Sequence, residues 1–376
     1  MAEQKVSDDD LIAYLGQHSQ RETAKHFGMN ARTITRRAKA LALKGFSPKH
    51  HMTRTVPDPF FVKGTSQLYR RGEAEPVLEW VKTAVDPDKM REAMLAACEA
   101  MTADLPQVAQ SPNAGDTLPH LLAVYPIGDA HIGMRAWGAE TQGESWDMAT
   151  AERVQCGAMA ALVDTAPAAD SAVIINLGDW FHADNMSGMT ERSGHVMDLD
   201  GRYAKMISVG IKVMRQCITS ALAKHRHVRV INVIGNHDDT GALWLSVALR
   251  HTYENEPRVL IDDSPSAFHY FEHGACLVGC HHGHNCKSEK LPGVMAADQS
   301  KAWGRTEHRY WYLGHVHHQS VKEYAGVTVE SFNTLAAKDA YAAFGGYRAR
   351  QNMKCIILHD QHGEVARHTV HPDMLK

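Results

Sequence analysis

The sequence predicts an α/β body, a sandwich of two sheets flanked by helices, preceded by a small all-α domain. From about residue 118, apolar stretches that end in polar clusters alternate with helical stretches near 149–165 and 203–226. Two later apolar runs, 324–332 and 353–370, have the pattern of antiparallel strands and would complete a second sheet. The first 50 residues instead combine short amphipathic helical stretches with a turn glycine.

Length and composition indicate an ordinary globular protein with more than one domain. The chain has 376 residues, of which 44% are hydrophobic and 22% charged, with a net charge of −3. A single core stops growing at roughly 250–300 residues, so we expect a main domain and a smaller one. No apolar run is long enough to cross a bilayer, and the first ten residues are acidic, so we expect a cytoplasmic protein with no membrane partner.

The chain divides into three predicted regions. Residues 1–50 form the expected helix-turn-helix domain, 51–117 contain two strand-like runs, a helical stretch and a flexible linker, and 118–376 form the main domain. The segment 19–54 carries nine Lys or Arg and one acid, a local charge of +8. Clustered cations favour a polyanion such as nucleic acid as the partner, because binding releases counterions.

The first domain has the pattern of a helix-turn-helix. A small residue, Ala24, lies four positions before the turn glycine Gly28, and Asn30 is placed to cap a second helix. The outer face of that helix presents four candidate DNA-binding residues: Arg32, Thr33, Arg36 and Lys39. Arg37 departs from the pattern, since many such motifs have a buried aliphatic residue there. A three-helix module that is purely structural or docks a protein is the alternative.

Five strand ends of the main domain each carry a cluster of His, Asp or Asn. They are GDAH at 128–131, GDWFH at 178–182, GNHD at 235–238, HHGH at 281–284 and GHVH at 314–317. Each cluster alone is a weak signal, because Gly-Asp is common in turns and His-x-His on surfaces. Open α/β sheets place functional groups at the carboxyl ends of strands, so we expect the five clusters to meet at one edge of a sheet.

Together and in this order, the clusters resemble the motifs of the calcineurin-like metallophosphoesterase superfamily, over about residues 120–372. Hydrolysis of a phosphoester at neutral pH uses two cations to neutralise the phosphate and activate a water. The ligands that the resemblance implies are Asp129, His131 and His317 for the first metal, Asn236, His282 and His315 for the second, and Asp179 as the bridge. Because all are nitrogen or oxygen donors, we expect two divalent metal ions, Mn²⁺ first, with Fe²⁺, Zn²⁺, Co²⁺ or Ni²⁺ as alternatives.

Two histidines are implied as catalytic residues. His237, in GNHD, is the group that protonates the leaving oxygen or steadies the transition state. Many protein phosphatases of the superfamily have a second Asp in the second motif, where this chain has His182 in GDWFH. At that position the chain is similar to nuclease subunits of the SbcCD type, in which a second catalytic histidine helps to rotate the phosphate. The resemblance therefore favours DNA as the substrate.

The sequence thus predicts a metal-dependent phosphodiesterase that hydrolyses DNA and is brought to it by the helix-turn-helix. The compact layout resembles a phage or prophage gene product, which would place the protein in the host cytoplasm. The sequence is compatible with a homo-oligomer. It lacks the heptad repeats of coiled-coil arms, so it does not support an ATPase partner. Two alternatives remain: a phosphatase or cyclic-nucleotide phosphodiesterase acting on small substrates, and a DNA-binding regulator with a vestigial phosphoesterase body.

Overall fold

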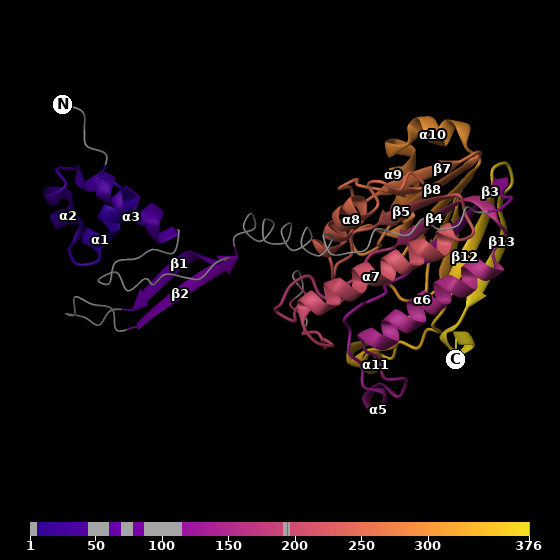
Figure 1. Ribbon diagram of the computed structural model, residues 1–376, viewed down its shortest axis with the longest axis horizontal. Coiled ribbons are helices and arrows are strands. Elements are labelled where there is room, and N and C mark those ends of the chain that lie inside the picture. Colours follow the sequence, from indigo (N-terminus) through magenta and orange to yellow (C-terminus); the bar gives the residue numbers. More distant parts are fainter. Residues whose placement is uncertain are drawn as a thin grey trace. The chain divides into compact units, whose positions relative to one another are not determined.

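A computed structural model of the chain contains two compact units, residues 1–97 and 98–376 (Figure 1). The structure describes residues 6–43, 60–68, 78–85, 115–190, 194 and 196–375. The helix expected after residue 86 and most of the linker that follows it lie outside these ranges. None of the helices within them has the length and hydropathy of a membrane span.

The first unit begins with three short helices and continues with a hairpin. The helices are α1 (Asp8–Leu15), α2 (Gln20–His26) and α3 (Ala31–Leu43). The side chain of Ser7 caps α1, and a capping box formed by Ser19 and Glu22 starts α2. The two predicted strand-like runs form an antiparallel pair, β1 (Phe60–Leu68) and β2 (Leu78–Val85).

The three helices enclose a small core on the faces that the sequence predicts. Its buried members are Leu11, Leu15, Ala24, Ile34, Ala38 and Leu41. Gly28 has the left-handed backbone that the turn requires, with φ 61°, and the side chain of Asn30 accepts a backbone hydrogen bond at the start of α3. Arg37 is half-buried and donates to the carbonyl of Val6 and the carboxylate of Asp8. An ion pair with α1 therefore replaces the aliphatic contact expected at this position.

The second unit contains two mixed sheets, which confirms the predicted two-sheet body. The first has the order β13-β12-β3-β4-β5-β6, made of β3 (Leu118–Ile127), β4 (Ala169–Asn176), β5 (His227–Asn232), β6 (Val259–Ile261), β12 (Met353–His359) and β13 (Gly363–Val370). The second has the order β10-β11-β9-β8-β7, made of β7 (His269–His273), β8 (Cys276–His281), β9 (His308–Leu313), β10 (Ser320–Tyr324) and β11 (Val327–Ser331). Because β3 to β6 are parallel, as are β8, β9 and β11, their carboxyl ends gather at one end of each sheet.

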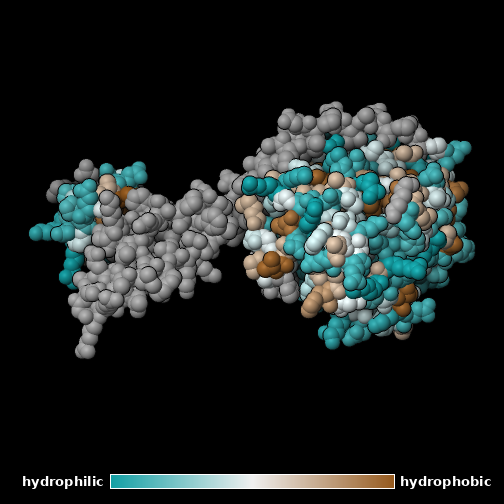
Figure 2. Space-filling view, turned by 90° about the horizontal axis from the view of Figure 1, so that it is seen from below, coloured by the Kyte–Doolittle hydropathy of each residue, from teal (hydrophilic) through white to brown (hydrophobic). Residues whose placement is uncertain are grey.

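Helices cover the outer face of each sheet. On the first sheet lie α6 (Met148–Thr165), α7 (Tyr203–Leu222) and α8 (Gly241–Thr252), and on the second lie α9 (Leu291–Asp298) and α10 (Ser300–Arg305). Figure 1 shows α6 and α7 side by side across the first sheet. Shorter elements are α5 (Gly138–Thr141), α11 (Ala340–Phe344), η2 (Ser288–Lys290) and η3 (Pro372–Leu375). The face of this unit seen in Figure 2 is largely hydrophilic with small hydrophobic patches, as is usual for a globular surface.

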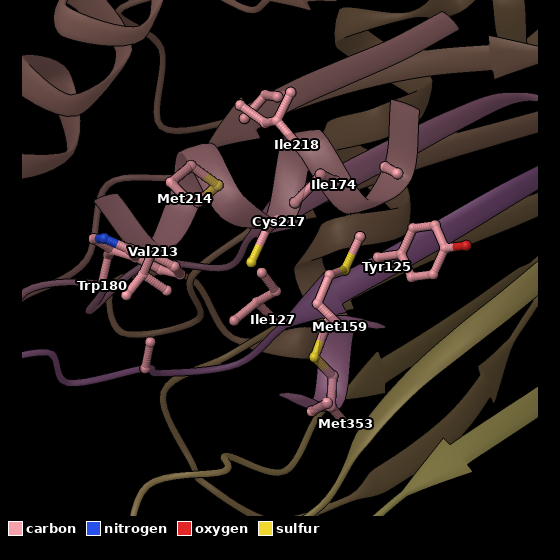
Figure 3. Packing of buried hydrophobic residues seen from close by; sticks show 14 of the residues in the cluster. Tyr125, Ile127, Met159, Ile174, Trp180, Val213, Met214, Cys217, Ile218 and Met353 are labelled. Atoms are coloured by element: carbon pink, nitrogen blue, oxygen red, sulfur yellow. The ribbon is translucent and has the colours of Figure 1, made fainter. Parts of the chain in front are cut away.

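The central strands of the first sheet are buried on both faces, so their side chains alternate between two cores. In β3, Leu122 and Val124 pack between the sheets, whereas Ala123 and Tyr125 pack under the helices. Figure 3 shows the core on the helix side, where Tyr125 lies near Met159 of α6. Burial on both faces explains why these strands read as nearly continuous apolar runs.

The C-terminal strands differ in part from the prediction. The run 324–332 forms β11, which belongs to the second sheet as expected. The run 353–370 forms β12 and β13, which join the first sheet instead, with β12 antiparallel to β3. Alternation identifies a strand but not its neighbour, and β12 is buried on both faces, with Ile356 toward the second sheet and Ile357 toward the helices.

Candidate metal centre

Five loops meet at the carboxyl ends of parallel strands from both sheets. Three follow β3, β4 and β5 in the first sheet, and two follow β8 and β9 in the second. Backbone hydrogen bonds join them, for example from the N–H of Leu177 to the carbonyl of Ile127 and from Gly314 to His282. The expectation that all five clusters meet at one edge of a single sheet is therefore wrong. Patterns along the chain identify strands, but they do not show which strands share a sheet.

Most of the candidate ligands have a left-handed backbone. The φ angles are 39° for Asp129, 44° for His131, 52° for Asp179, 69° for His315 and 54° for His317. Among the described residues, Gln142 is the one other non-glycine residue with a positive φ. Each such conformation costs of order 1–3 kcal/mol and persists only where the surroundings hold it in place. Strain is therefore concentrated in the loops that carry the motifs.

Glycines in the motifs let these loops approach one another closely. A Cβ at Gly235 would lie 2.1 Å from Oδ1 of Asp179, and a Cβ at Gly178 would lie 2.5 Å from Nδ1 of His282. Atoms cannot approach that closely, so any larger residue would push the carboxylate or the imidazole out of place. The glycines of GD and GN are therefore required by the shape of the site.

Asp129, His131 and His317 form one group of candidate ligands, each with a donor atom within 4.8 Å of the others. Nε2 of His317 lies 3.2 Å from Nε2 of His131 and 3.3 Å from Oδ1 of Asp129. Asp129 is fully buried, and both of its oxygens accept a hydrogen bond from the backbone N–H of His315 at 2.9 Å. This group is the set that the sequence motifs assign to the first metal.

Asp179, His282 and His315 form a second group with the same spacing. Nε2 of His282 lies 3.2 Å from Oδ2 of Asp179 and 3.0 Å from Oδ1 of Asn236. Nδ1 of His282 donates to the carbonyl of Leu177 at 2.8 Å, so Nε2 is the nitrogen that faces the cluster. The structure thus brings the bridge and the ligands assigned to the second metal together.

Of the three histidines in the CHHGH run, His282 is the one that joins these groups. His281 instead stacks on Phe268, with ring centroids 4.6 Å apart, and its Nδ1 accepts from the backbone N–H of Gly283. The ring centroid of His284 lies 5.2 Å from that of His282, but His284 belongs to neither of the two groups found among the described residues.

Opposite charges face each other within the second group. Burial opposes ionisation of Asp179, but the charge and hydrogen bond of His282 outweigh it and hold the pKa of this carboxyl well below its usual value. Burial also opposes a charged His282, yet the carboxylate of Asp179 raises its pKa to about 10. A cation bound here would displace the proton of this imidazole, so metal binding should release protons.

The chemistry of the donor set fits divalent cations. The seven candidate ligands supply only imidazole nitrogens and carboxylate or amide oxygens. Mixed sets of this kind suit Mn²⁺, Fe²⁺ and Zn²⁺. Asp129 and Asp179 are each at most 2% exposed, and buried carboxylates are costly unless positive charge compensates them. Bound cations would supply that charge.

His182 and His237 lie beside the first group and form a third cluster with His131. Nδ1 of His182 is 3.1 Å from Nδ1 of His131, and the rings of His182 and His237 stack with centroids 5.3 Å apart. Nδ1 of His237 donates to the carbonyl of His182 at 3.0 Å, so Nε2 of His237 is the nitrogen that can act on a substrate. Burial and the nearby His237 lower the pKa of His182 to about 3, so its ring is neutral at neutral pH.

Two aspartates that the sequence did not single out support these loops. Asp238 is fully buried and accepts hydrogen bonds at 3.1 Å from the backbone N–H groups of Asp179, Phe181 and Gly235. It therefore joins the loops after β4 and β5. Asp184 accepts from the backbone N–H groups of Thr240, just before α8, and Gly241, the first residue of α8. The place of Asp238 in the GNHD motif was a usable signal, whereas nothing in the sequence marked Asp184.

A cleft of about 850 Å³ opens onto the cluster. Its lining includes His131, Asp179 and His317, together with the catalytic candidates His182 and His237. The volume is within the usual range for sites that bind small molecules or parts of a polymer. Further walls come from Thr190, from residues 196–198 and from the segment 339–349, which the sequence motifs do not include.

The predicted DNA-binding residues lie on α3 in the first unit. Arg32, Arg36 and Lys39 are exposed, on the side of the helix away from the buried Ile34. Thr33 is half-buried, which limits its contribution to an outer surface. DNA binding by α3 stays a prediction.

No family model matches the chain, and no curated protein matches it. Similar solved structures include a predicted phosphoesterase from Streptococcus pneumoniae, with 10% identity, a TM-score of 0.31 and coverage of 67% of this chain and 91% of that one. A novel archaeal phosphodiesterase has 13% identity, a TM-score of 0.33 and coverage of 66% and 99%. The phosphopantetheinyl hydrolase of Mycobacterium tuberculosis has 10% identity, a TM-score of 0.27 and coverage of 61% and 94%. Similarities this low carry no weight for the activity, which we infer from the site.

Proposed function

We propose that this chain is a metal-dependent phosphodiesterase of the calcineurin-like superfamily that hydrolyses DNA. The observation that carries the proposal is the convergence of seven nitrogen and oxygen donors from five loops, with five of these donors lining one cleft. These are the residues that the sequence motifs assign to two metals and a bridge. A regulator with a vestigial site would have no use for buried carboxylates held on strained loops.

The side chains of the centre have different roles in hydrolysis. When bound, two divalent cations would neutralise the phosphodiester and lower the pKa of the attacking water. In its doubly protonated form, His237 would give its Nε2 proton to the leaving oxygen, because its Nδ1–H is committed to the carbonyl of His182. His182 stays neutral, so its one N–H can orient a phosphate oxygen without adding charge.

Two features favour DNA over small phosphate esters. His182 occupies the place at which many phosphatases of the superfamily have a second Asp. In addition, α3 exposes Arg32, Arg36 and Lys39, which would contact the phosphates of a DNA backbone. We propose that the first unit brings the catalytic unit to DNA, and that Mn²⁺ is the metal used.

The decisive experiment compares substrates with one purified, full-length protein. The protein is stripped of metal, reconstituted with Mn²⁺, and assayed on labelled linear, circular and single-stranded DNA beside bis(p-nitrophenyl) phosphate and p-nitrophenyl phosphate. We expect hydrolysis of DNA and of the diester, both dependent on Mn²⁺. Linear against circular DNA separates exonuclease from endonuclease action.

An Asp179→Asn variant purified in parallel guards against a contaminating nuclease, since it removes the bridging charge and should abolish genuine activity. Hydrolysis of the monoester alone would move the phosphatase alternative to the front. DNA binding with no hydrolysis of any ester, whichever metal is supplied, would favour the regulator.

A further inference from the structure

The cleft has a wall that none of the sequence motifs supplies. The segment 339–349, which includes α11, contributes Tyr341, Tyr347 and Arg348 to the lining of the cleft that His237 and His317 also line. The proposed hydrolysis of a phosphodiester assigns no task to these side chains. They are nevertheless placed where the part of a substrate next to the scissile phosphate would lie.

This wall is aromatic and open to solvent. Tyr341 is 67% exposed, Tyr347 is 58% exposed, and Phe344, on the same short helix, is 97% exposed. The rings of Tyr341 and Tyr347 lie nearly parallel, at 29°, with centroids 6.5 Å apart. Large aromatic side chains normally gain by burial, so an exposed pair beside a catalytic cleft indicates a surface for another flat, apolar group.

The turn after α11 holds Tyr347 in position. Its backbone N–H donates to the carbonyl of Ala342 at 3.0 Å, and the N–H of Gly345 donates to Tyr341 at 2.9 Å. A Cβ at Gly345 would lie 2.7 Å from the ring of Tyr347, so the ring packs against the glycine backbone. A ring held in this way loses little freedom when a ligand stacks on it.

Cationic side chains accompany the aromatic pair. The guanidinium of Arg348 donates to the backbone carbonyls of Ala343 and Tyr347 at 2.8–3.2 Å, which fixes its charge at the turn that carries Tyr347. Arg350 is also exposed, two residues further on. Asp339 lines the same wall, but its carboxylate caps α11. Stacking rings next to fixed cations are what proteins use to hold single-stranded nucleic acid.

A second pocket, of about 250 Å³, adjoins the cleft at the loop after β9. Val316 and His318 line both cavities, and Lys287 and Lys322 line the second one. A mononucleotide would need only the first cavity. A pair of cavities with cations in each is suited to a chain that carries a phosphate at every step.

We propose that Tyr341 and Tyr347 form a stacking site for an unpaired base of the DNA strand whose phosphate lies at the metal ligands. This inference rests on the proposed nuclease function and makes it more specific. The preferred substrate then has single-stranded DNA, an overhang or a frayed end at the scissile bond, since a paired base has both faces covered by its neighbours in the duplex.

The test compares single-stranded DNA with the small diester in full-length variants. Replacing both tyrosines with Ala should lower the ratio of kcat/KM for single-stranded DNA to kcat/KM for bis(p-nitrophenyl) phosphate by roughly 10- to 100-fold, because base stacking is lost. Replacing both with Phe should restore most of the ratio, since Phe keeps the ring. Phe344→Ala is the matched control: an exposed aromatic of the same helix that does not line the cleft.

A fluorescent base provides a readout that does not depend on turnover. In a His182→Ala background, which should retain its metals but lose most DNA cleavage, 2-aminopurine in single-stranded DNA should be quenched on binding, and Ala at both tyrosines should remove that quenching. An unchanged ratio and unchanged quenching in the Ala variant, with a wild type that cuts single-stranded DNA, would overturn the stacking site alone. A wild type that cuts duplex DNA but neither binds nor cuts single-stranded DNA would overturn the stacking site alone, and a wild type that cuts no form of DNA would overturn the stacking site and the DNA assignment together.

Discussion

The two regions in which we propose function use charge in opposite ways. On α3, Arg32, Arg36 and Lys39 are exposed on a regular helix whose other face packs into a small core. In the metal centre, Asp129 and Asp179 are buried on loops with a left-handed backbone. Contact with the charge of a polymer needs only an exposed surface, whereas holding two cations close together needs buried charge fixed by several loops.

This difference predicts that substitutions in the two regions will impair different properties of the protein. Substitutions on α3 should weaken DNA binding and change its salt dependence while leaving metal content alone. Substitutions in the metal centre should remove metal or turnover while leaving the charge of α3 alone. Variants that behave otherwise would show that the two regions do not work separately.

The largest effect should come from Asp179→Asn. The substitution removes the negative charge of the carboxylate assigned as the bridge, so metal content should fall and turnover should drop by several orders of magnitude. Metal analysis beside the diester assay measures both. Asp164→Asn makes the same change at an exposed position of α6 and should behave as wild type. Two metals per chain and near-normal turnover in Asp179→Asn would show that the site assignment is wrong.

His182→Ala should have the next largest effect, and it separates a nuclease from a phosphatase. The variant should retain its metals but lose DNA cleavage by about 10²- to 10⁴-fold, the range for a group that positions or moves a proton. Hydrolysis of bis(p-nitrophenyl) phosphate should fall less, because its good leaving group needs little help. Equal and small losses on both substrates would count against the nuclease interpretation.

Replacing Arg32, Arg36 and Lys39 with Ala should affect affinity rather than chemistry. Each lost phosphate contact removes about 0.9 from the slope of log K against log salt, so three contacts would flatten the slope by up to about 2.7. Titration of duplex DNA at several salt concentrations measures the change. A control that replaces three exposed cations of the second unit, Lys212, Arg250 and Lys301, removes the same charge. Equal effects in both triple variants would mean that α3 contributes only through net charge.

The same contrast explains how much the sequence could predict. The helices of the first unit follow from local signals, such as the serines that cap them and the spacing of Ile34, Ala38 and Leu41. The ligand loops follow from the apolar strands that precede them. What local patterns cannot give is which strands become neighbours, so β12 was assigned to the wrong sheet and the site to a single sheet edge.

The sequence also could not predict contacts that form only when the chain folds. Asp238 joins two loops through backbone groups of residues 59 and 57 positions away, Asp179 and Phe181. The aromatic wall of Tyr341 and Tyr347 carries no motif, because its meaning depends on the cleft that it faces. Motifs therefore predicted which side chains gather, whereas the fold was needed to show what supports and surrounds them.

The smallest effect concerns a buried charge outside the cleft, and it tests whether burial alone makes a charge important to stability. The Asp262 side chain is 10% exposed and pairs with Arg229 and with Nδ1 of His269. Burial raises the pKa of this carboxyl, but the hydrogen bonds to His269 and Arg229 outweigh burial and hold the pKa below its ordinary value. The adjacent Asp263 pairs with Arg250 at the surface, and its side chain is 67% exposed.

Asp262→Asn should therefore lower the free energy of unfolding at pH 7 by about 2 kcal/mol, the range for a hydrogen bond to a charged group. A carboxyl whose pKa is lower in the folded chain contributes its full stabilisation above the unfolded pKa of about 4 and loses it as pH falls toward the folded value. The gap between wild type and Asp262→Asn should thus narrow below about pH 4, as followed by urea unfolding of the metal-free protein. Asp263→Asn should differ from wild type by no more than about 0.5 kcal/mol at either pH, since exposed ion pairs contribute little. A pH-independent gap for Asp262→Asn would mean that the hydrogen bonds, and not the charge, carry the effect.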